Sequence, residues 1–345
     1  MTKFYNTKVA GIVYAFIHFS VEVACFYFIY SRLNNHPLWW SFALLFDALA
    51  FLPQNVIGLI ADAFKKIPYG AIGCIMILLA FCVRVNVIGL IILCLGNCLV
   101  HIDGAQHTLN SNDGKITPNA VFVGGGSFGV ICGQLLGVKN IGVLILVPLL
   151  VMTISLVLSY LFTKNHDLSP KPNEKSINIH NNKLPLGIFL VFVMFAVACR
   201  SYTSYAIPIA WKKTEFQAIL LFSFMGIGKM LGGVFADNIG YRKTSILSLL
   251  VSLPFLAFGN SIMIISLLGV MLYSMTMPIT VGLLVSKFKN AHCFAFGITT
   301  IALFLGIAPA FFVQPTTLIS NLIVCICTCL TALLFLLITI RENKN

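Results

Sequence analysis

Long apolar stretches separated by short polar turns fill most of this 345-residue chain. Hydrophobic residues make up 59% of the sequence and charged residues only 9%, far below the roughly 25% charged that is typical of soluble domains. A helix needs ~20 apolar residues to cross a bilayer. We therefore predict an all-α polytopic membrane protein with about twelve transmembrane helices, over residues 8–30, 38–61, 67–84, 86–107, 119–138, 140–163, 185–205, 214–236, 243–259, 261–286, 290–313 and 317–340.

The formal net charge of +12 is distributed unevenly between the predicted loops. With the amino terminus inside, fifteen Lys and Arg residues fall on the inner side and six on the outer side. Because cytoplasmic loops carry the excess of basic residues, both termini are expected in the cytosol. The first apolar run is too long for a signal-peptide core, so we expect it to be a true membrane helix. We expect a cell membrane of the bacterial inner-membrane type.

One short motif occurs twice, each time at the end of an apolar stretch. The segments GLIADAFKK, from Gly58 to Lys66, and GVFADNIGYRK, from Gly233 to Lys243, place Asp62 and Asp237 175 residues apart, about half of the chain. The one clearly polar stretch lies between the sixth and seventh spans. We therefore predict a first six-helix bundle over residues 1–163, a cytoplasmic linker over 164–184 and a second six-helix bundle over 185–345.

Glycines recur every four residues in the fifth span. Residues four apart share one face of a helix, so this stripe lets another backbone approach closely. Two interpretations stay open, a static packing seam or a seam along which the two halves rock. The seam residues are Gly125, Gly129, Gly133 and Gly137, with Gly228 and Gly232 in the eighth span.

The duplicated turns resemble the signature loop of the major facilitator superfamily. Gly240, Arg242 and Lys243 complete the second copy, whereas Lys65 and Lys66 stand in a first copy without that glycine. The resemblance implies two six-helix bundles around a central cavity that opens to either side in turn. It also implies that Asp62, Lys65, Lys66, Asp237, Arg242 and Lys243 form gate loops, in which the acids pair with basic residues and helix ends.

A narrower resemblance covers roughly residues 95 to 137. The segments VHIDGAQ, starting at Val100, and GGSFGVICGQ, starting at Gly125, look like the fourth and fifth spans of fosmidomycin-resistance-type facilitators. Here Ile102 and Gln134 stand where that subgroup has prolines. The subgroup resemblance favours drug-type efflux by proton antiport, and the direction of transport stays open.

Ionisable residues inside spans usually mark pathways or relays. Glu22 lies near the middle of the first span with His18 four residues earlier on the same face, and Asp47 lies near the middle of the second span. We predict that Glu22, Asp47 and His18 couple transport to protons, because a low-dielectric cavity eases the protonation of a carboxyl. For Glu22, packing or substrate contact are alternatives. Asp47 has a structural alternative as partner of His18 or Tyr14.

Other polar groups in the spans are candidates for the substrate cavity. We assign His101, Arg200, Tyr14 and Gln54 to it. Each of two residues has an alternative without a functional role. His101 could be a structural residue with satisfied hydrogen bonds, and Arg200 could extend to interfacial water. We expect Lys229 to reach water in that way, Asp103 to face the cytosol and His292 to be structural.

The sequence can be compared with three classes of function. A secondary active transporter of a small molecule, coupled to protons, needs no nucleotide site, and the sequence has no Gly-x-x-x-x-Gly-Lys-Ser/Thr run. An intramembrane enzyme is disfavoured because no His-Glu-x-x-His helix and no Gly-x-Ser-x-Gly elbow occurs. A transporter-like receptor or lipid-handling protein without proton coupling is the alternative. We expect a monomer in the lipid bilayer, with no cofactor, no metal and no nucleic-acid partner.

Overall fold

The computed structural model describes residues 7–110, 114–139, 141–165, 184–207, 209–259, 261–312 and 317–338. All the regular structure in these ranges is helical. The predicted all-α membrane fold is confirmed, because ten helical segments are long and apolar enough to cross a membrane. Their bounds agree with the predicted spans to within a few residues. Residues 166–183 of the predicted linker lie outside the described residues.

The first half of the chain supplies five of the ten candidate spans, two of which are composite, and the shorter apolar helix α4. The second span is made of α2 and α3, and the sixth of the short 3₁₀ helix η1 followed by α7. The bounds are α1 Thr7–Arg32, α2 Trp39–Phe51, α3 Gln54–Ala63, α4 Tyr69–Cys82, α5 Asn86–Leu109, α6 Thr117–Lys139, η1 Gly142–Ile145 and α7 Leu146–Asn165.

The second half supplies the other five candidate spans, two of which are composite but at other positions, together with helix α10. The tenth span is made of α11 and α12, and the eleventh of α13 followed by the 3₁₀ helix η2. The bounds are α8 Leu186–Ala206, α9 Glu215–Ile239, α10 Tyr241–Phe258, α11 Met263–Ser274, α12 Thr276–Lys287, α13 His292–Ile307, η2 Ala308–Phe311 and α14 Thr317–Ile338.

Local sequence explains where the helices break and turn. Pro53 lies at the break between α2 and α3, where its ring cannot continue the hydrogen-bond ladder. Thr214 and Gln217 form a capping box at the start of α9. Gly240 alone joins α9 to α10 with φ 92°, a backbone conformation that favours glycine. The first copy of the motif has no glycine there and uses the longer turn from Phe64 to Pro68 instead.

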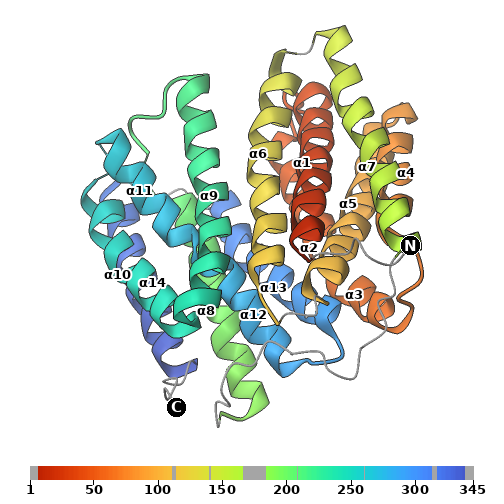
Figure 1. Cartoon of the computed structure of the whole chain (residues 1–345). Helices are drawn as coiled ribbons and strands as arrows, with labels where there is room; N and C mark the ends of the chain where they lie inside the picture. The colour runs from red at the N-terminus through yellow and green to blue at the C-terminus, as the bar shows by residue number, and fades with distance from the viewer. Residues whose placement is uncertain are drawn as a thin grey trace.

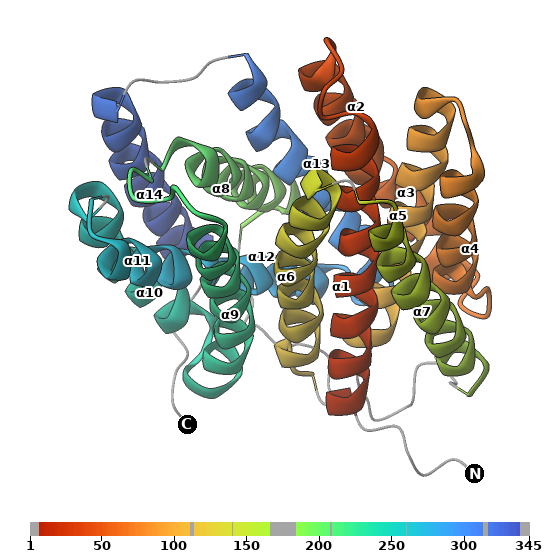
Figure 2. The same ribbon diagram turned by 90° about the horizontal axis from the view of Figure 1, so that it is seen from above.

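The two halves of the chain lie side by side (Figures 1 and 2). Helices α1 to α7, red to yellow-green, gather on one side, and most helices of the second half, green to blue, on the other. At the boundary α6 packs against α9, and α13 packs against α2, α3 and α5. The boundary is therefore where residues of the two halves can meet.

The stripe of glycines in α6 packs inside the first half. A Cβ at Gly125 or Gly129 would overlap the backbone of α1 at Ala15 or Phe19, and Gly133 and Gly137 also face α1. In the second half, Gly228 and Gly232 lie against the backbone of Met271 and Met275. These stripes thus bring helices of the same half together, which favours the static of the two interpretations.

Other glycines make the contacts between the halves. Gly124 of α6 lies against Gly226 and Met230 of α9, and Gly226 lies against Phe128. Sequence spacing did not single out Gly124 and Gly226. Gly124 is next to Gly125 in the sequence, and both are glycines. Only the rotation of α6 about its axis decides that Gly124 faces α9 and Gly125 faces α1.

Candidate functional site

A cavity of about 240 Å³ lies at the boundary between the two halves. The first half contributes lining residues from α1, α2, α5 and α6, and the second half from α8, α9, α12 and α13. Its ionisable lining residues are His18, Glu22, Asp47, His101, Arg200 and Lys229. A neighbouring pocket of about 460 Å³ shares Phe222 and Met225 with it and reaches Lys212, just before the start of α9. The hollow thus extends toward the end of the molecule opposite to the Asp237 turn.

Three side chains contact the carboxylate of Glu22 in this cavity. One of its oxygens, Oε1, lies 3.5 Å from Nε2 of His18 and 3.5 Å from Nε2 of His101. Asn97 donates to the same oxygen from its side-chain amide at 3.3 Å. The three side chains of Glu22, His18 and His101 are all buried. The carboxylate of Glu22 in α1 is thereby joined to α5, through the ring of His101 and the side-chain amide of Asn97.

The tautomers of the two histidines follow from their other ring nitrogens. Nδ1 of His18 lies 2.9 Å from the carbonyl oxygen of Phe122, and Nδ1 of His101 lies 3.0 Å from that of Asn97. A carbonyl can only accept, so each Nδ1 carries the hydrogen and each Nε2 faces Glu22. A neutral ring would turn a lone pair toward the carboxylate oxygen. The cluster is therefore favourable when it holds at least one shared proton or another cation.

Asp47, Arg200 and Lys229 complete the charged lining. Asp47 is half-buried, and its carboxylate makes no hydrogen bond or ion pair within the described residues. Arg200 is 6% exposed, and its Nη1 atom has no hydrogen-bond partner within the described part of the chain. Lys229 donates to the hydroxyl of Ser127 at 2.8 Å, across the boundary. The expectation that Lys229 reaches water is wrong, because its position in α9 directs it into the cavity.

Two residues assigned to the cavity from the sequence lie elsewhere. Tyr14 is fully buried and donates its hydroxyl hydrogen to Asp103 at 2.8 Å. Gln54 is also fully buried, and its side-chain amide donates to the carbonyl of Ala50 at 2.7 Å, at the break between α2 and α3. Neither residue lines the cavity. Their helices point these side chains into the packed interior of the first half.

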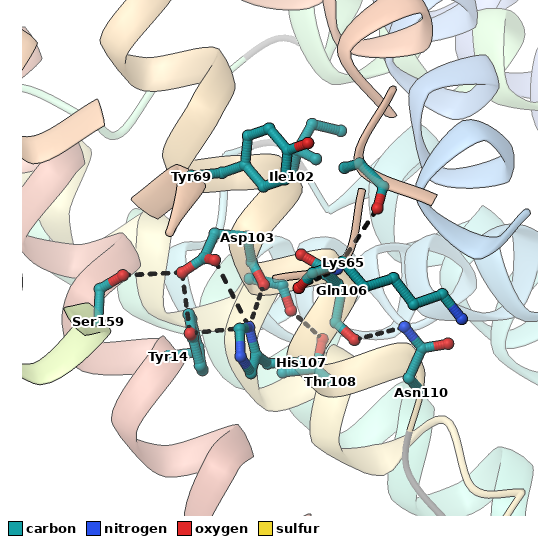
Figure 3. Close-up of polar contacts among 12 residues, drawn as sticks. Tyr14, Lys65, Tyr69, Ile102, Asp103, Gln106, His107, Thr108, Asn110 and Ser159 are labelled. Carbon is teal, nitrogen blue, oxygen red and sulfur yellow. Dashed lines mark hydrogen bonds and ion pairs between the residues drawn. The ribbon is translucent and has the colours of Figure 1, made fainter. Parts of the chain in front are cut away.

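The expectation that Asp103 faces the cytosol is wrong. Figure 3 shows it at the centre of a buried polar network, and its exposed fraction is 0%. Its Oδ2 atom accepts from Tyr14 and, at 2.9 Å, from Ser159 of α7, while Nδ1 of His107 lies 3.6 Å from Oδ1. Gly70 of α4 leaves room for this carboxylate, because a Cβ there would overlap it. The polar contacts tie α1, α5 and α7 together, and α4 packs against them through Gly70.

The two signature aspartates cap helices of the opposite half. Asp62 accepts the backbone N–H groups of Cys293 at 3.1 Å and Phe294 at 2.9 Å, at the start of α13. Asp237 accepts those of Ile116 at 3.0 Å and Thr117 at 2.9 Å, at the start of α6. Helix starts carry unpaired N–H groups and partial positive charge, so they favour a carboxylate.

The basic residues of the two turns do not pair with these acids. No ion pair within 4.0 Å joins Asp62 or Asp237 to a basic side chain of the described residues. Arg242 instead donates to the carbonyl of Leu336 in α14 at 3.3 Å. Lys66 and Lys243 are exposed, and Lys65 is half-buried. The helix ends are thus the direct partners of both aspartates. His292 accompanies them, with Nδ1 2.7 Å from the Asn110 side-chain oxygen.

The structure is similar to solved transporters along nearly the whole chain. It matches a major facilitator superfamily transporter, FucP, in the outward conformation, with a TM-score of 0.64 and 14% identity over 97% of this chain and 100% of that one. A variant of the E. coli fucose:proton symporter FucP matches with a TM-score of 0.62 and 12% identity, over 98% and 100%. The protein has an MFS-like fold.

A third match supports the MFS-like fold. A bacterial homologue of the iron transporter ferroportin, in an outward-facing state, matches with a TM-score of 0.60 and 12% identity, over 96% of this chain and 98% of that one. No family model and no curated protein matches the sequence. At these identities the likeness shows the fold alone.

Proposed function

We propose that the protein is a secondary active transporter, which moves a small molecule across the membrane by alternating access and couples that movement to protons. The MFS-like fold supports the transport class. The similar FucP protein is a fucose:proton symporter, which supports coupling to protons. In this proposal residues 1–163 and 185–345 move as two bundles joined by a cytoplasmic linker, 164–184, with both termini in the cytosol of a bacterial cell.

The observation that carries the proposal is the position of Glu22. Its carboxylate lies in a cavity at the boundary between the halves, within 3.5 Å of two imidazole nitrogens. An ionisable group inside the membrane is costly and is kept where it binds an ion or moves a proton. We assign proton binding to Glu22, His18 and Asp47. His101 and Arg200 contact the substrate in this scheme.

The two aspartate caps supply the second requirement, a barrier on one side. Asp62 and Asp237 hold together the ends of α3, α13, α9 and α6 at one end of the molecule, while the hollow extends toward the other end. We propose that these caps close the cytoplasmic side and break when the cavity opens inward. A bound proton or substrate then shifts the balance only through its different affinity for the two states.

The test is a proteoliposome assay that follows internal pH with a trapped fluorescent indicator. A panel of anionic, cationic, zwitterionic and neutral metabolites is added outside, one at a time. Uptake by symport acidifies the interior, whereas uptake in exchange for protons makes it more alkaline. Drug-type antiport predicts the second sign. The control is liposomes with the Glu22→Gln variant at equal protein content. Substrate uptake with no change of internal pH would remove proton coupling from the proposal.

A further inference from the structure

The charges that line the cavity are divided between the two halves of the chain. Glu22 in α1 and Asp47 in α2 carry the acidic groups, and Arg200 in α8 and Lys229 in α9 carry the basic groups. Within the described residues, no ion pair joins an acid of this set to one of these two cations. The cavity therefore has an acidic wall in the first half and a basic wall in the second.

One group on each wall lacks a partner in the protein. Nη1 of Arg200 is buried with no hydrogen-bond partner among the described residues. Asp47 has no hydrogen bond or ion pair there either, whereas Glu22 is held by Asn97 and two histidines, and Lys229 by Ser127. Burying a charge without a partner costs free energy that a bound counter-charge can offset. Arg200 and Asp47 are thus the cation and the anion with the fewest partners, and they lie on opposite walls.

We propose that the substrate is a small zwitterion of amino-acid size, an inference that rests on the transport function proposed above. Its anionic group binds Arg200, with Lys229 beside it, because a guanidinium offers paired donors to a carboxylate. Its cationic group binds Asp47 on the opposite wall, with Glu22 near it. Asp47 is then deprotonated, so the cationic group and a proton compete for this carboxylate. Such a molecule spans the boundary and pairs both walls at once, so that binding draws the two halves together.

The remaining lining of the cavity fits this class. About 240 Å³ holds roughly eight water molecules at ~30 Å³ each, which is room for a small molecule between the two walls. Much of the lining is aromatic, and a phenyl face attracts an ammonium group. The phenylalanines concerned are Phe26, Phe46, Phe51, Phe222 and Phe296.

Ligands of other charge fit less well. A simple anion leaves Asp47 without a partner, and a simple cation leaves Arg200 without one. A divalent metal ion has three possible ligands within 4.8 Å of one another in His18, Glu22 and His101. However, Arg200 and Lys229 line the same cavity and repel a doubly charged ion. Metal binding is therefore an outcome that the experiment must be able to detect.

The experiment measures equilibrium binding to the full-length protein in lipid nanodiscs, with no proton gradient. The probes are ω-amino acids from glycine to 6-aminohexanoate, each compared with the carboxylic acid and the amine of equal chain length, and with ZnCl₂. We expect one amino acid of the series to bind about tenfold or more tightly than its matched acid and amine, about 1.4 kcal/mol. The chain length of that member reports the separation of the two walls.

Two variants assign the walls. Arg200→Gln is expected to bind the zwitterion no better than the matched amine, and Asp47→Asn no better than the matched acid. Lys213→Gln, at an exposed position, is the control and should bind as the unchanged protein does. Arg200→Lys and Asp47→Glu keep the charge and are expected to retain part of the preference, which separates loss of charge from loss of folding.

Several outcomes would overturn the zwitterion proposal. These are equal binding of the zwitterion and its matched acid or amine, an unchanged preference in both neutralised variants, or Zn²⁺ binding that needs His18 and excludes every organic probe. The transport proposal is tested separately. Zwitterion binding with no proton movement in proteoliposomes keeps the substrate class and removes coupling. Proton movement driven only by non-zwitterions keeps transport and removes the substrate class.

Discussion

Asp62 and Asp237 have reciprocal positions, because each caps a helix in the half of the chain that contains the other. Asp62 of α3 binds the start of α13, and Asp237 of α9 binds the start of α6. Each aspartate also has a glycine four residues before it, on the same helix face. Gly58 lies against the backbone of Cys293, and Gly233 lies against Ala120 and Thr117.

The duplicated Gly-x-x-Ala-Asp motif therefore has a physical explanation. The glycine lets a helix start of the opposite half approach the backbone, and the aspartate binds the N–H groups that this helix start leaves unpaired. In the proposed transport cycle, these two contacts favour the state in which that end of the molecule is closed. Two predictions follow from the two halves of the motif.

Replacing either aspartate by asparagine should weaken the closed end. Asp237→Asn keeps one acceptor but loses the negative charge at the start of α6, which is worth about 1–2 kcal/mol at a helix cap. We expect roughly a fivefold to thirtyfold shift toward the state open at that end and a lower turnover, with the protein still folded. Transport in vesicles at matched protein level measures this, with Asn238→Ala at the adjacent exposed position as the control. Unchanged turnover would show that the cap has no role in the cycle.

Adding a methyl group at the motif glycine should open the same end sterically. Gly58→Ala places a Cβ into the backbone of Cys293, so the start of α13 must move away. Cys293 is itself fully buried and serves as a native reporter. We expect faster alkylation of Cys293 by N-ethylmaleimide, read by peptide mass spectrometry. Gly142→Ala and Gly187→Ala, where a Cβ meets nothing within 4 Å, are matched controls. Equal labelling in all variants would contradict the proposed closure.

Neutralising the central carboxylate should separate transport from its driving force. Glu22→Gln removes the charge that faces both histidines but preserves the shape of the side chain. We expect proton-driven accumulation of substrate to be lost, while exchange of labelled for unlabelled substrate stays measurable. Lys213→Gln, at an exposed position, is the control for removal of one charge outside the cavity. Normal accumulation driven by a pH gradient in Glu22→Gln would exclude Glu22 from coupling.

The Asp103 network should govern stability rather than transport. Tyr14→Phe removes one donor to a fully buried carboxylate (Figure 3), and leaving a buried polar group short of a partner costs about 1–3 kcal/mol. We expect a lower melting temperature in detergent and unchanged proton coupling in the protein that remains folded. Loss of coupling at unchanged stability would instead place Asp103 in the proton pathway.

Much of the fold could be predicted from the sequence, because the bilayer leaves few alternatives. The hydrocarbon interior forces backbone hydrogen bonds into helices, so the apolar stretches alone predicted the spans, including 86–107, observed as α5 Asn86–Leu109. The repeated motif pointed to Asp62 and Asp237, since a turn of the same composition at half-chain spacing indicates a repeated unit. Glu22, His18, Asp47, His101 and Arg200 were selected as charges that the membrane makes costly, and all five line one cavity.

The tertiary structure decided which way each of these side chains points. Tyr14 and His18 share one face of α1, yet only His18 reaches the cavity, because Tyr14 lies one turn nearer the start of the helix and meets Asp103 of α5 there. Gly124 and Gly125 are adjacent, yet one faces α9 and the other α1. Hydropathy fixes how deep a residue lies in the membrane, but the rotation of a helix about its axis is set by packing against helices that are distant in the sequence. That rotation determines which side chains line the cavity and which lie in the packed core, and it is set only when the helices pack together.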